Sequence, residues 1–185
     1  MTAVSVARGV PRRGLRAGLV AFVIFEAAWV ACVVGAARGS AGAGVAVVTV
    51  VVLLHLAVTT RRRLEFVLIA AAIGVGLVWD SLLLRAGWVH YASPGPVPEL
   101  APAWILALWA LLAITLRGPL QSLQRRPLVS ALLGALGGPL SYWGAQRLGA
   151  CVLSPQAPLV LALGWAVLLP SLLLLARHLD ARGLR

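Results

Sequence analysis

The chain has 185 residues, of which 61% are hydrophobic, 16 are basic and only five are acidic, giving a formal net charge of +11. This composition and the mean hydropathy of +0.97 exclude an ordinary soluble domain. All the basic residues are arginines that fall in short runs between apolar segments, which argues against nucleic-acid binding. The composition therefore predicts an all-α fold, a polytopic bundle embedded in a lipid bilayer.

Six apolar segments are candidates for transmembrane helices. A helix needs about 20 residues to cross a hydrocarbon core of about 30 Å. The second and fourth segments are shorter, so we expect them to borrow the flanking residues 41–44 and 99–102. The six segments are 15–37, 45–60, 64–84, 103–116, 128–150 and 158–176.

The arginines indicate an orientation. Thirteen belong to the termini and to one set of alternate connections, whereas only Arg38, Arg85 and Arg147 belong to the other set. Because cytoplasmic loops carry the excess of basic residues, both termini are predicted in the cytoplasm. The chain then divides into a basic cytoplasmic N-terminus (1–14), a six-helix transmembrane domain (15–177) and a cytoplasmic tail (178–185).

The connection 85–102 is the longest on the predicted outer side, and it contains four prolines. Prolines at alternate positions favour extended backbone over helix. Trp88, Tyr91 and Trp104 at its ends are typical of interfacial anchors. We therefore expect an ordered cap over the outer face.

The segment from Gly134 to Arg147 is the most polar of the candidate spans. Gly134 and Gly138 belong to a stripe of small residues spaced by three or four, which is a helix-packing pattern. Pro139 removes a backbone donor and predicts a kink between residues 137 and 140. These features predict that the fifth helix is kinked and lies at the centre of the bundle.

Two charged residues, Asp80 and Arg147, are predicted at similar depth near the outer face, and we expect them to be paired or bridged by water. A structural ion pair would explain why both occur in a membrane. The alternative is functional: Arg147, with Ser141, Tyr142 and Gln146 on the same segment, would offer donors to an anionic group beneath the cap.

Glu26 lies near mid-depth in the first segment and His55 lies in the second, so the two side chains could share a proton. Alternatively, Glu26 bonds a neighbouring backbone or hydroxyl group and His55 points into the interface. Glu65 at the start of the third segment is expected to meet Arg61, Arg62, Arg63 or Arg117.

The sequence contains no pattern typical of a metal or cofactor site. Its three histidines lie at different levels, and no His or Cys pair has the spacing of metal ligands. No phosphate-binding glycine loop or nucleophile elbow is present. A disulfide between Cys32 and Cys151 is possible but not favoured. We therefore expect no cofactor and no metal.

Several short motifs resemble a known family. They are DSLL at 80–83, PAW at 102–104, LW at 108–109 and GPLSY at 138–142. With these motifs the chain resembles the bacterial inner-membrane family catalogued as domain of unknown function 2878, over nearly its whole length. The resemblance implies fold and location. The chain departs from the family pattern at Glu26, where the resemblance implies an uncharged amide, so a role shared with the family is not implied for this position.

Three functions remain open from the sequence. The first is a protein that binds or processes a lipid or other amphiphile at a polar site near the outer face, using Asp80, Ser141, Tyr142, Gln146, Arg147 and Glu26. The second is a non-catalytic subunit whose glycine face packs against a membrane-protein partner. The third is a small transporter with a mid-membrane site on a broken fifth helix. Whether the protein is an enzyme stays open.

Overall fold

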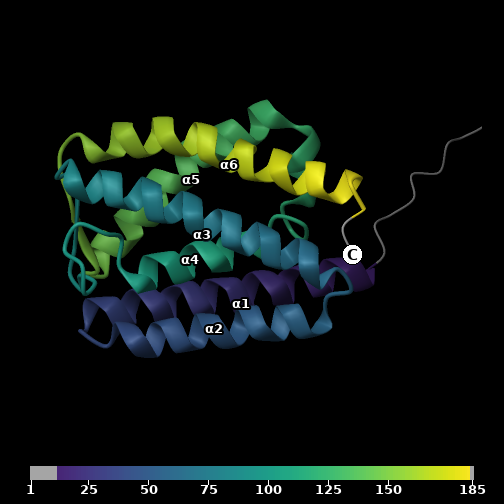
Figure 1. Cartoon of the computed structure of the whole chain (residues 1–185), viewed down its shortest axis with the longest axis horizontal. Helices are drawn as coiled ribbons and strands as arrows, with labels where there is room; N and C mark the ends of the chain where they lie inside the picture. The colour runs from purple at the N-terminus through teal and green to yellow at the C-terminus, as the bar shows by residue number, and fades with distance from the viewer. Residues whose placement is uncertain (1–11, 184–185) are drawn as a thin grey trace, which may run out of the picture.

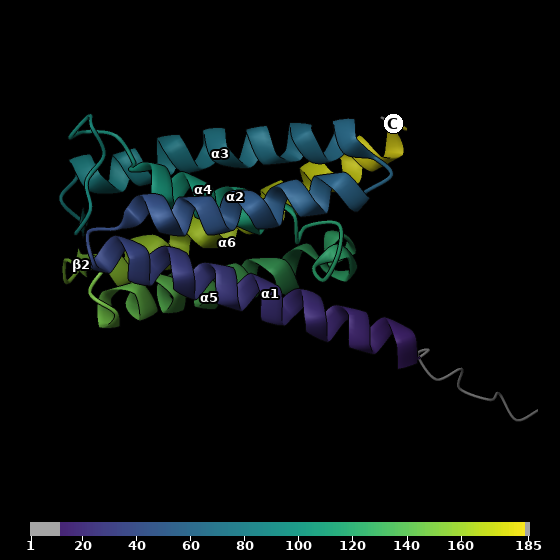
Figure 2. The same cartoon turned by 90° about the horizontal axis from the view of Figure 1, so that it is seen from below.

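A computed structural model describes residues 12–183 of the chain, with side chains from residue 18 onward. Its elements run approximately along one axis (Figures 1 and 2). Figure 1 shows α1 and α2 along one edge of the bundle and α6 along the other, with α3 and α4 between them. In chain order, the elements are α1 (Arg12–Ala37), α2 (Ala41–Val58), α3 (Arg62–Arg85), β1 (Val89–Tyr91), α4 (Ala103–Ala113), the 3-10 helix η1 (Gln121–Arg125), α5 (Pro127–Arg147), β2 (Cys151–Leu153) and α6 (Ala157–Ala181).

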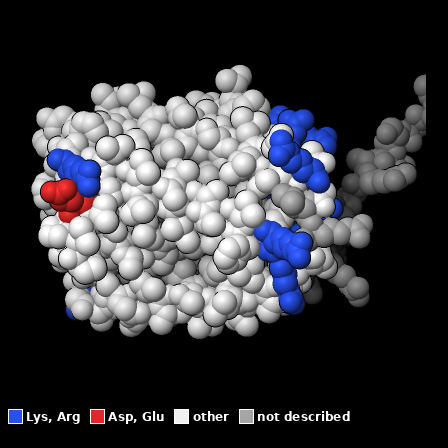
Figure 3. All heavy atoms as spheres, viewed as in Figure 1, with Lys and Arg blue, Asp and Glu red and all other residues white. Residues whose placement is uncertain are grey.

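The fold is that of a membrane protein. Five of the described helices, α1, α2, α3, α5 and α6, are long and apolar enough to cross a bilayer. The surface between the two ends of the bundle is almost free of charge in Figure 3. Helix α2 begins at Ala41, so it recruits the flanking residues 41–44, as the sequence predicts. This extension brings it to 18 residues.

The fourth segment is shorter than predicted, because α4 has only 11 residues and recruits nothing from residues 99–102. Pro102 is its N-cap residue, and at 1.5 Å per residue the helix covers about half of a hydrocarbon core. Turns and η1 complete the path to α5. Their backbone finds partners inside the protein: Thr115 Oγ1 donates to the Leu112 carbonyl, and the Gln124 side chain donates to the Leu116 carbonyl.

Helix α4, and not α5, is the central helix, so the predicted position of the fifth helix is wrong. Most of α4 is buried, and it contacts α1, α2 and α3. Helix α5 packs chiefly on α6 and exposes leucines at every fourth position. Its exposed stripe consists of Leu128, Leu132, Leu136 and Leu140, which are 62–80% exposed. Pro139 lies inside α5, and the helix runs through it without interruption.

Close contacts between glycines and indoles bring the helices together. A Cβ on Gly138 of α5 would lie 2.3 Å from Cδ1 of Trp165 in α6, and a Cβ on Gly134 would lie 2.1 Å from the Trp165 carbonyl oxygen. Gly76 of α3 meets the ring of Trp109 in the same way. The two indoles and the α6 backbone at Trp165 therefore occupy space that only glycine leaves open.

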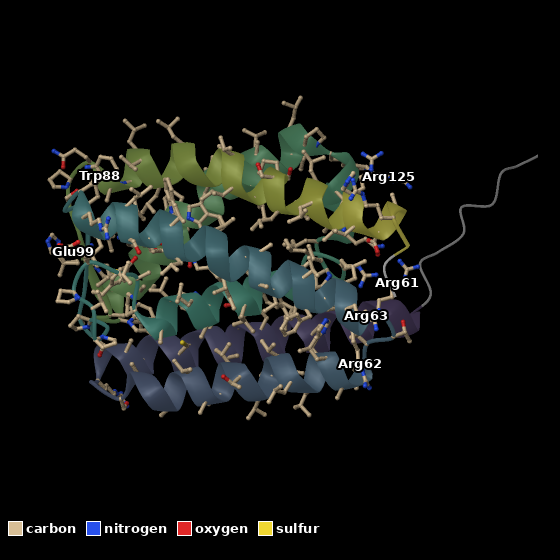
Figure 4. The ribbon with its side chains drawn as sticks, viewed as in Figure 1. Arg61, Arg62, Arg63, Trp88, Glu99 and Arg125 are labelled. Carbon is tan, nitrogen blue, oxygen red and sulfur yellow. The ribbon has the colours of Figure 1, made fainter. Side chains whose placement is uncertain are left out.

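The segment between α3 and α4 forms an ordered cap at one end of the bundle, where Figure 4 shows Trp88 and Glu99. Strands β1 and β2 pair antiparallel, so this connection is joined to the one between α5 and α6. Ser93 links the cap to two helices: its hydroxyl donates to the Ala36 carbonyl, and its own carbonyl accepts from the Trp104 indole. The Ala101 amide also donates to the Ser81 hydroxyl.

The opposite end of the bundle carries most of the described arginines. Figure 3 shows this basic end, and Figure 4 shows Arg61, Arg62, Arg63 and Arg125 there. The beginning of α1 and the end of α6 lie at this same end (Figure 1). The uneven distribution of arginines along the sequence therefore becomes a separation between the two ends of the bundle.

Candidate functional site

A cavity of about 480 Å³ lies among α1, α4, α5 and α6, below the cap. It follows α5 from Leu133 to Ala145, which corresponds to about 18 Å at the helical rise. Glu26 of α1 and Gly137, Leu140 and Ser141 of α5 are exposed and also line the cavity. The cavity therefore reaches the side of the bundle between α1 and α5.

Asp80 organises the inner wall of this cavity. The carboxylate is completely buried on α3 and accepts three hydrogen bonds. The Tyr91 hydroxyl donates to Oδ1 at 2.5 Å, the Tyr142 hydroxyl donates to the same oxygen, and the Trp109 indole donates to Oδ2 at 2.7 Å. Both tyrosines of the chain thus bind one carboxylate oxygen. All three donors line the cavity, whereas Asp80 does not. Asp80 therefore lies behind the cavity wall and holds these three side chains in place.

Four separate elements supply this cluster. Asp80 lies on α3, Tyr91 on β1, Trp109 on α4 and Tyr142 on α5. Gly76, one turn before Asp80, makes room for the Trp109 ring, which also stacks on Trp165 of α6 with ring centroids 4.9 Å apart. A single buried carboxylate therefore joins α3, α4, α5 and the cap.

The predicted pairing of Asp80 with Arg147 is wrong. No cationic side chain of the described residues forms a salt bridge with Asp80. Arg147 is exposed, and its guanidinium lies 5.7 Å from the ring centroid of Trp143. Neutral hydroxyl and indole donors satisfy the carboxylate in place of a cation.

The other predicted site residues on α5 have different positions. Tyr142 and Ser141 line the cavity. Gln146 does not line it, because its side-chain oxygen accepts a hydrogen bond from the Leu153 amide at 2.7 Å and joins the end of α5 to β2. The structure therefore brings Ser141 and Tyr142 to one cavity, with Asp80 bonded behind Tyr142, but leaves Gln146 and Arg147 outside it.

Glu26 and His55 do not meet, contrary to the proton-sharing hypothesis. Glu26 lies at the cavity mouth and forms no salt bridge with any described residue. His55 Nε2 lies 3.4 Å from Glu65 Oε2, without the alignment of a hydrogen bond. The acidic partner of His55 is therefore at the basic end of the bundle.

A second polar cluster joins the helices at the basic end. Glu65 is buried and accepts a hydrogen bond from Arg117 at 2.6 Å, so the predicted interaction of Glu65 with an arginine is confirmed for Arg117. Arg117 and Arg61 both donate to Asp180 of α6 at 3.0 Å. Burial lowers the pKa of Arg117, but its bonds to Asp180 and Glu65 outweigh burial and leave the pKa raised. The arginine therefore stays charged.

The two cysteines are buried free thiols, and Cys151 lines the cavity. The Cys32 thiol donates to the Trp104 carbonyl, and the Cys151 thiol donates to the Tyr142 carbonyl. Burial, and next the charge of Asp80, raises the pKa of Cys151 to about 11. Burial also raises the pKa of Tyr91 in the adjacent strand, with Tyr142 and Asp80 adding to the shift. These groups therefore remain protonated at neutral pH.

Among the described residues, no group of three His, Cys, Asp or Glu side chains could hold a metal ion. Sequence reasoning missed Trp109 as a partner of Asp80, and it treated Tyr91 only as an interfacial anchor. The sequence does contain one indication of these contacts: a buried carboxylate needs hydrogen-bond donors, and Trp109 and Tyr91 both carry polar hydrogens. Their positions in the cluster depend on how the helices face one another.

The geometry defines a polar cluster behind an aromatic cavity in a membrane protein. No curated protein and no solved structure matches the chain significantly. The family described as "Protein of unknown function (DUF2878)" matches residues 18–171, which are most of the chain. These residues include α2 to α5 and the cluster around Asp80, and the chain belongs to this family.

Proposed function

We propose that the protein binds an amphiphile in the cavity between α1 and α5. The observation that carries this proposal is the cavity itself. Its volume of about 480 Å³ lies within the range of about 300–1,000 Å³ that is typical of ligand pockets. Most of its lining is apolar or aromatic, and it reaches the side of the bundle. A hydrocarbon chain could therefore enter from the bilayer without crossing water.

We further propose that the protein resides in the inner membrane with both termini in the cytoplasm. The arginines at one end of the bundle support this orientation through the positive-inside rule. The cap and the cluster around Asp80 then lie toward the outer face, and the amphiphile occupies the outer half of the membrane.

The features that suggested a partner subunit or a transporter are not available for those functions. The glycine face of α5 is covered by Trp165 of the same chain, so Gly134 and Gly138 are not free to receive a partner. Helix α5 is continuous through Pro139, so it lacks the break that a mid-membrane transport site would use. The cavity between α1 and α5 still supports amphiphile binding.

Filling the cavity tests the proposal. Gly137 lines the cavity, and a Cβ there would have no atom within 4 Å. We expect Gly137→Leu to leave the fold intact and to reduce the amphiphile retained by the protein after purification in a mild detergent. Native mass spectrometry of the intact protein would measure the retained molecules.

A matched control is Gly74→Leu on α3. Gly74 also has no atom within 4 Å of its Cβ position, but it does not line the cavity. We expect this variant to retain the amphiphile as the wild type does. Equal retention by Gly137→Leu, or wild-type protein that retains no amphiphile, would contradict the proposed function.

A further inference from the structure

The charge inside the cavity restricts the ligand. Among the described residues that line the cavity, Glu26 is the only charged one, and none is an arginine or a histidine. The absence is notable in a chain with 16 basic residues. A phosphate or carboxylate head group would therefore lose its hydration inside the cavity without gaining a cationic partner.

Hydrogen bonding within the protein also disfavours an anionic ligand. The hydroxyl protons of Tyr91 and Tyr142 and the indole proton of Trp109 are all donated to Asp80. The indole proton of Trp104 is donated to the Ser93 carbonyl. These four side chains line the cavity, yet their polar hydrogens are already used within the protein. An anionic group would compete with Asp80 or with the Ser93 carbonyl for them. The buried indole proton of Trp165, which also lines the cavity, has no partner among the described residues, but it is a neutral donor and not a cation.

The cavity wall is rich in π-electron faces. Cations are attracted to the faces of Trp, Tyr and Phe, most strongly in sites shielded from water. Seven of the 12 aromatic residues of the chain line this cavity, and they surround it from α1, β1, α4, α5 and α6. They are Phe25, Trp29, Tyr91, Trp104, Trp109, Tyr142 and Trp165.

Glu26 supplies a negative charge at the mouth of this aromatic cavity. Its side chain is exposed on α1, about 16 Å along the helix from Ala37, at a depth where hydrocarbon surrounds the bundle. It also borders a shallow groove on the outer surface of α1. Glu26 has no cationic partner among the described residues, and an ionised carboxylate in this position is costly unless a cation joins it.

We infer that the cavity selects an amphiphile with a positively charged nitrogen, held by the Glu26 carboxylate and the aromatic wall. This inference rests on the proposed function and names the class of its ligand. The ammonium group could belong to a lipophilic amine or to the head group of a zwitterionic lipid. Both sources present the same charge to Glu26 and the same surface to the indoles.

Three probes with the same chain length test the selection: dodecylamine, dodecanol and dodecanoate. The full-length protein would be delipidated in a neutral detergent, and native mass spectrometry would measure the retention of each probe. We expect dodecylamine to bind about tenfold more tightly than dodecanol and dodecanoate to bind most weakly. Glu26→Gln should reduce the preference for the amine over the alcohol at least several-fold.

Glu99→Gln is the matched control, because it removes an acidic side chain that is 74% exposed and lies in the cap, outside the cavity. It should keep the wild-type preference. Nanodiscs of phosphatidylethanolamine and of phosphatidylglycerol then separate the two sources. Retention of the zwitterionic lipid would assign the ammonium to a head group, and retention of dodecylamine alone would assign it to a lipophilic amine.

Equal retention of amine and alcohol, or an unchanged preference in Glu26→Gln, would overturn the selection for a cation and leave amphiphile binding standing. Retention of none of the three probes and of neither lipid would instead overturn the proposed function itself. The two failures are therefore distinguishable.

Discussion

At the scale of single residues, Asp80 is the position on which the candidate site depends most. Its two oxygens accept all three of the hydrogen bonds that hold Tyr91, Tyr142 and Trp109. A buried carboxylate satisfied by neutral donors is sensitive to truncation, since each donor that loses its acceptor costs about 1–3 kcal/mol. The conformation of the cavity wall therefore depends on this one side chain.

We expect Asp80→Ala to lower the free energy of unfolding by at least about 3 kcal/mol, because three buried donors lose their acceptor. Asp80→Asn keeps one oxygen acceptor and should lose less. Thermal unfolding in detergent would measure both variants. Arg147→Ala is the control: the side chain is exposed and unpaired with Asp80, so a change within about 0.5 kcal/mol is expected. A large loss of stability in Arg147→Ala would instead support an ion pair between Asp80 and Arg147.

At the scale of elements, α5 has two glycines in adjacent positions with different surroundings. Gly138 faces Trp165 of α6, whereas Gly137 faces open space in the cavity. The same substitution therefore tests helix packing at one position and ligand binding at the next. This contrast separates the structural from the functional side of the helix.

Gly138→Leu should destabilise the protein, because even its Cβ would lie 2.3 Å from the Trp165 ring and the indole cannot move without disturbing its stack on Trp109. Overpacking of this kind costs about 1–3 kcal/mol or more. Thermal unfolding in detergent would show the loss, with Gly137→Leu as the control in the same helix. Equal stability of the two variants would contradict the packing of α5 on α6.

The basic end offers a second prediction about elements. Arg117 connects Glu65 of α3 with Asp180 of α6, so Arg117→Ala would leave the buried Glu65 carboxylate without its arginine. Removing one partner of a buried pair costs about 3–5 kcal/mol. Arg85→Ala is the control, because its pair with Glu99 is exposed and worth about 0–1 kcal/mol. Equal unfolding temperatures of the two variants would exclude a structural role for the Arg117 cluster.

At the scale of the whole molecule, the orientation in the membrane decides which end of the bundle, the cap or the basic end, faces the cytoplasm. A cysteine at position 97 would lie in the cap, and a cysteine at position 63 would lie at the basic end. We expect Val97→Cys to react with a membrane-impermeant maleimide in intact cells and Arg63→Cys to react only after permeabilisation. The reverse pattern would place the termini outside.

The native cysteines do not obscure this labelling. Cys32 and Cys151 are buried, and the pKa of Cys151 is raised to about 11. Because the folded protein favours the neutral thiol, the contribution of Cys151 to stability is complete below about pH 9 and is lost as the pH rises toward 11. Labelling near pH 7 therefore reports the introduced cysteines.

The sequence by itself determined the class of the protein, the approximate bounds of its helices and the separation of its arginines. These properties depend on how many apolar residues follow one another and on where charge interrupts them. The stripe that contains Gly134 and Gly138 was also readable, because small residues recur at helical spacing whatever the helix packs against.

Only the tertiary structure decided which residues meet. The helices are apolar on nearly all sides, so hydrophobic periodicity does not show which face of each helix turns inward. Helix α4 lies at the centre although it is too short for a complete span, because the turns after it find hydrogen-bond partners inside the protein. Asp80 meets two tyrosines and a tryptophan instead of Arg147, because the rotation of α3 about its axis aims the carboxylate at them and away from the outer surface. The depth of a residue along its helix follows from counting residues in the sequence. The side of the helix on which its side chain lies follows only from how the helices pack.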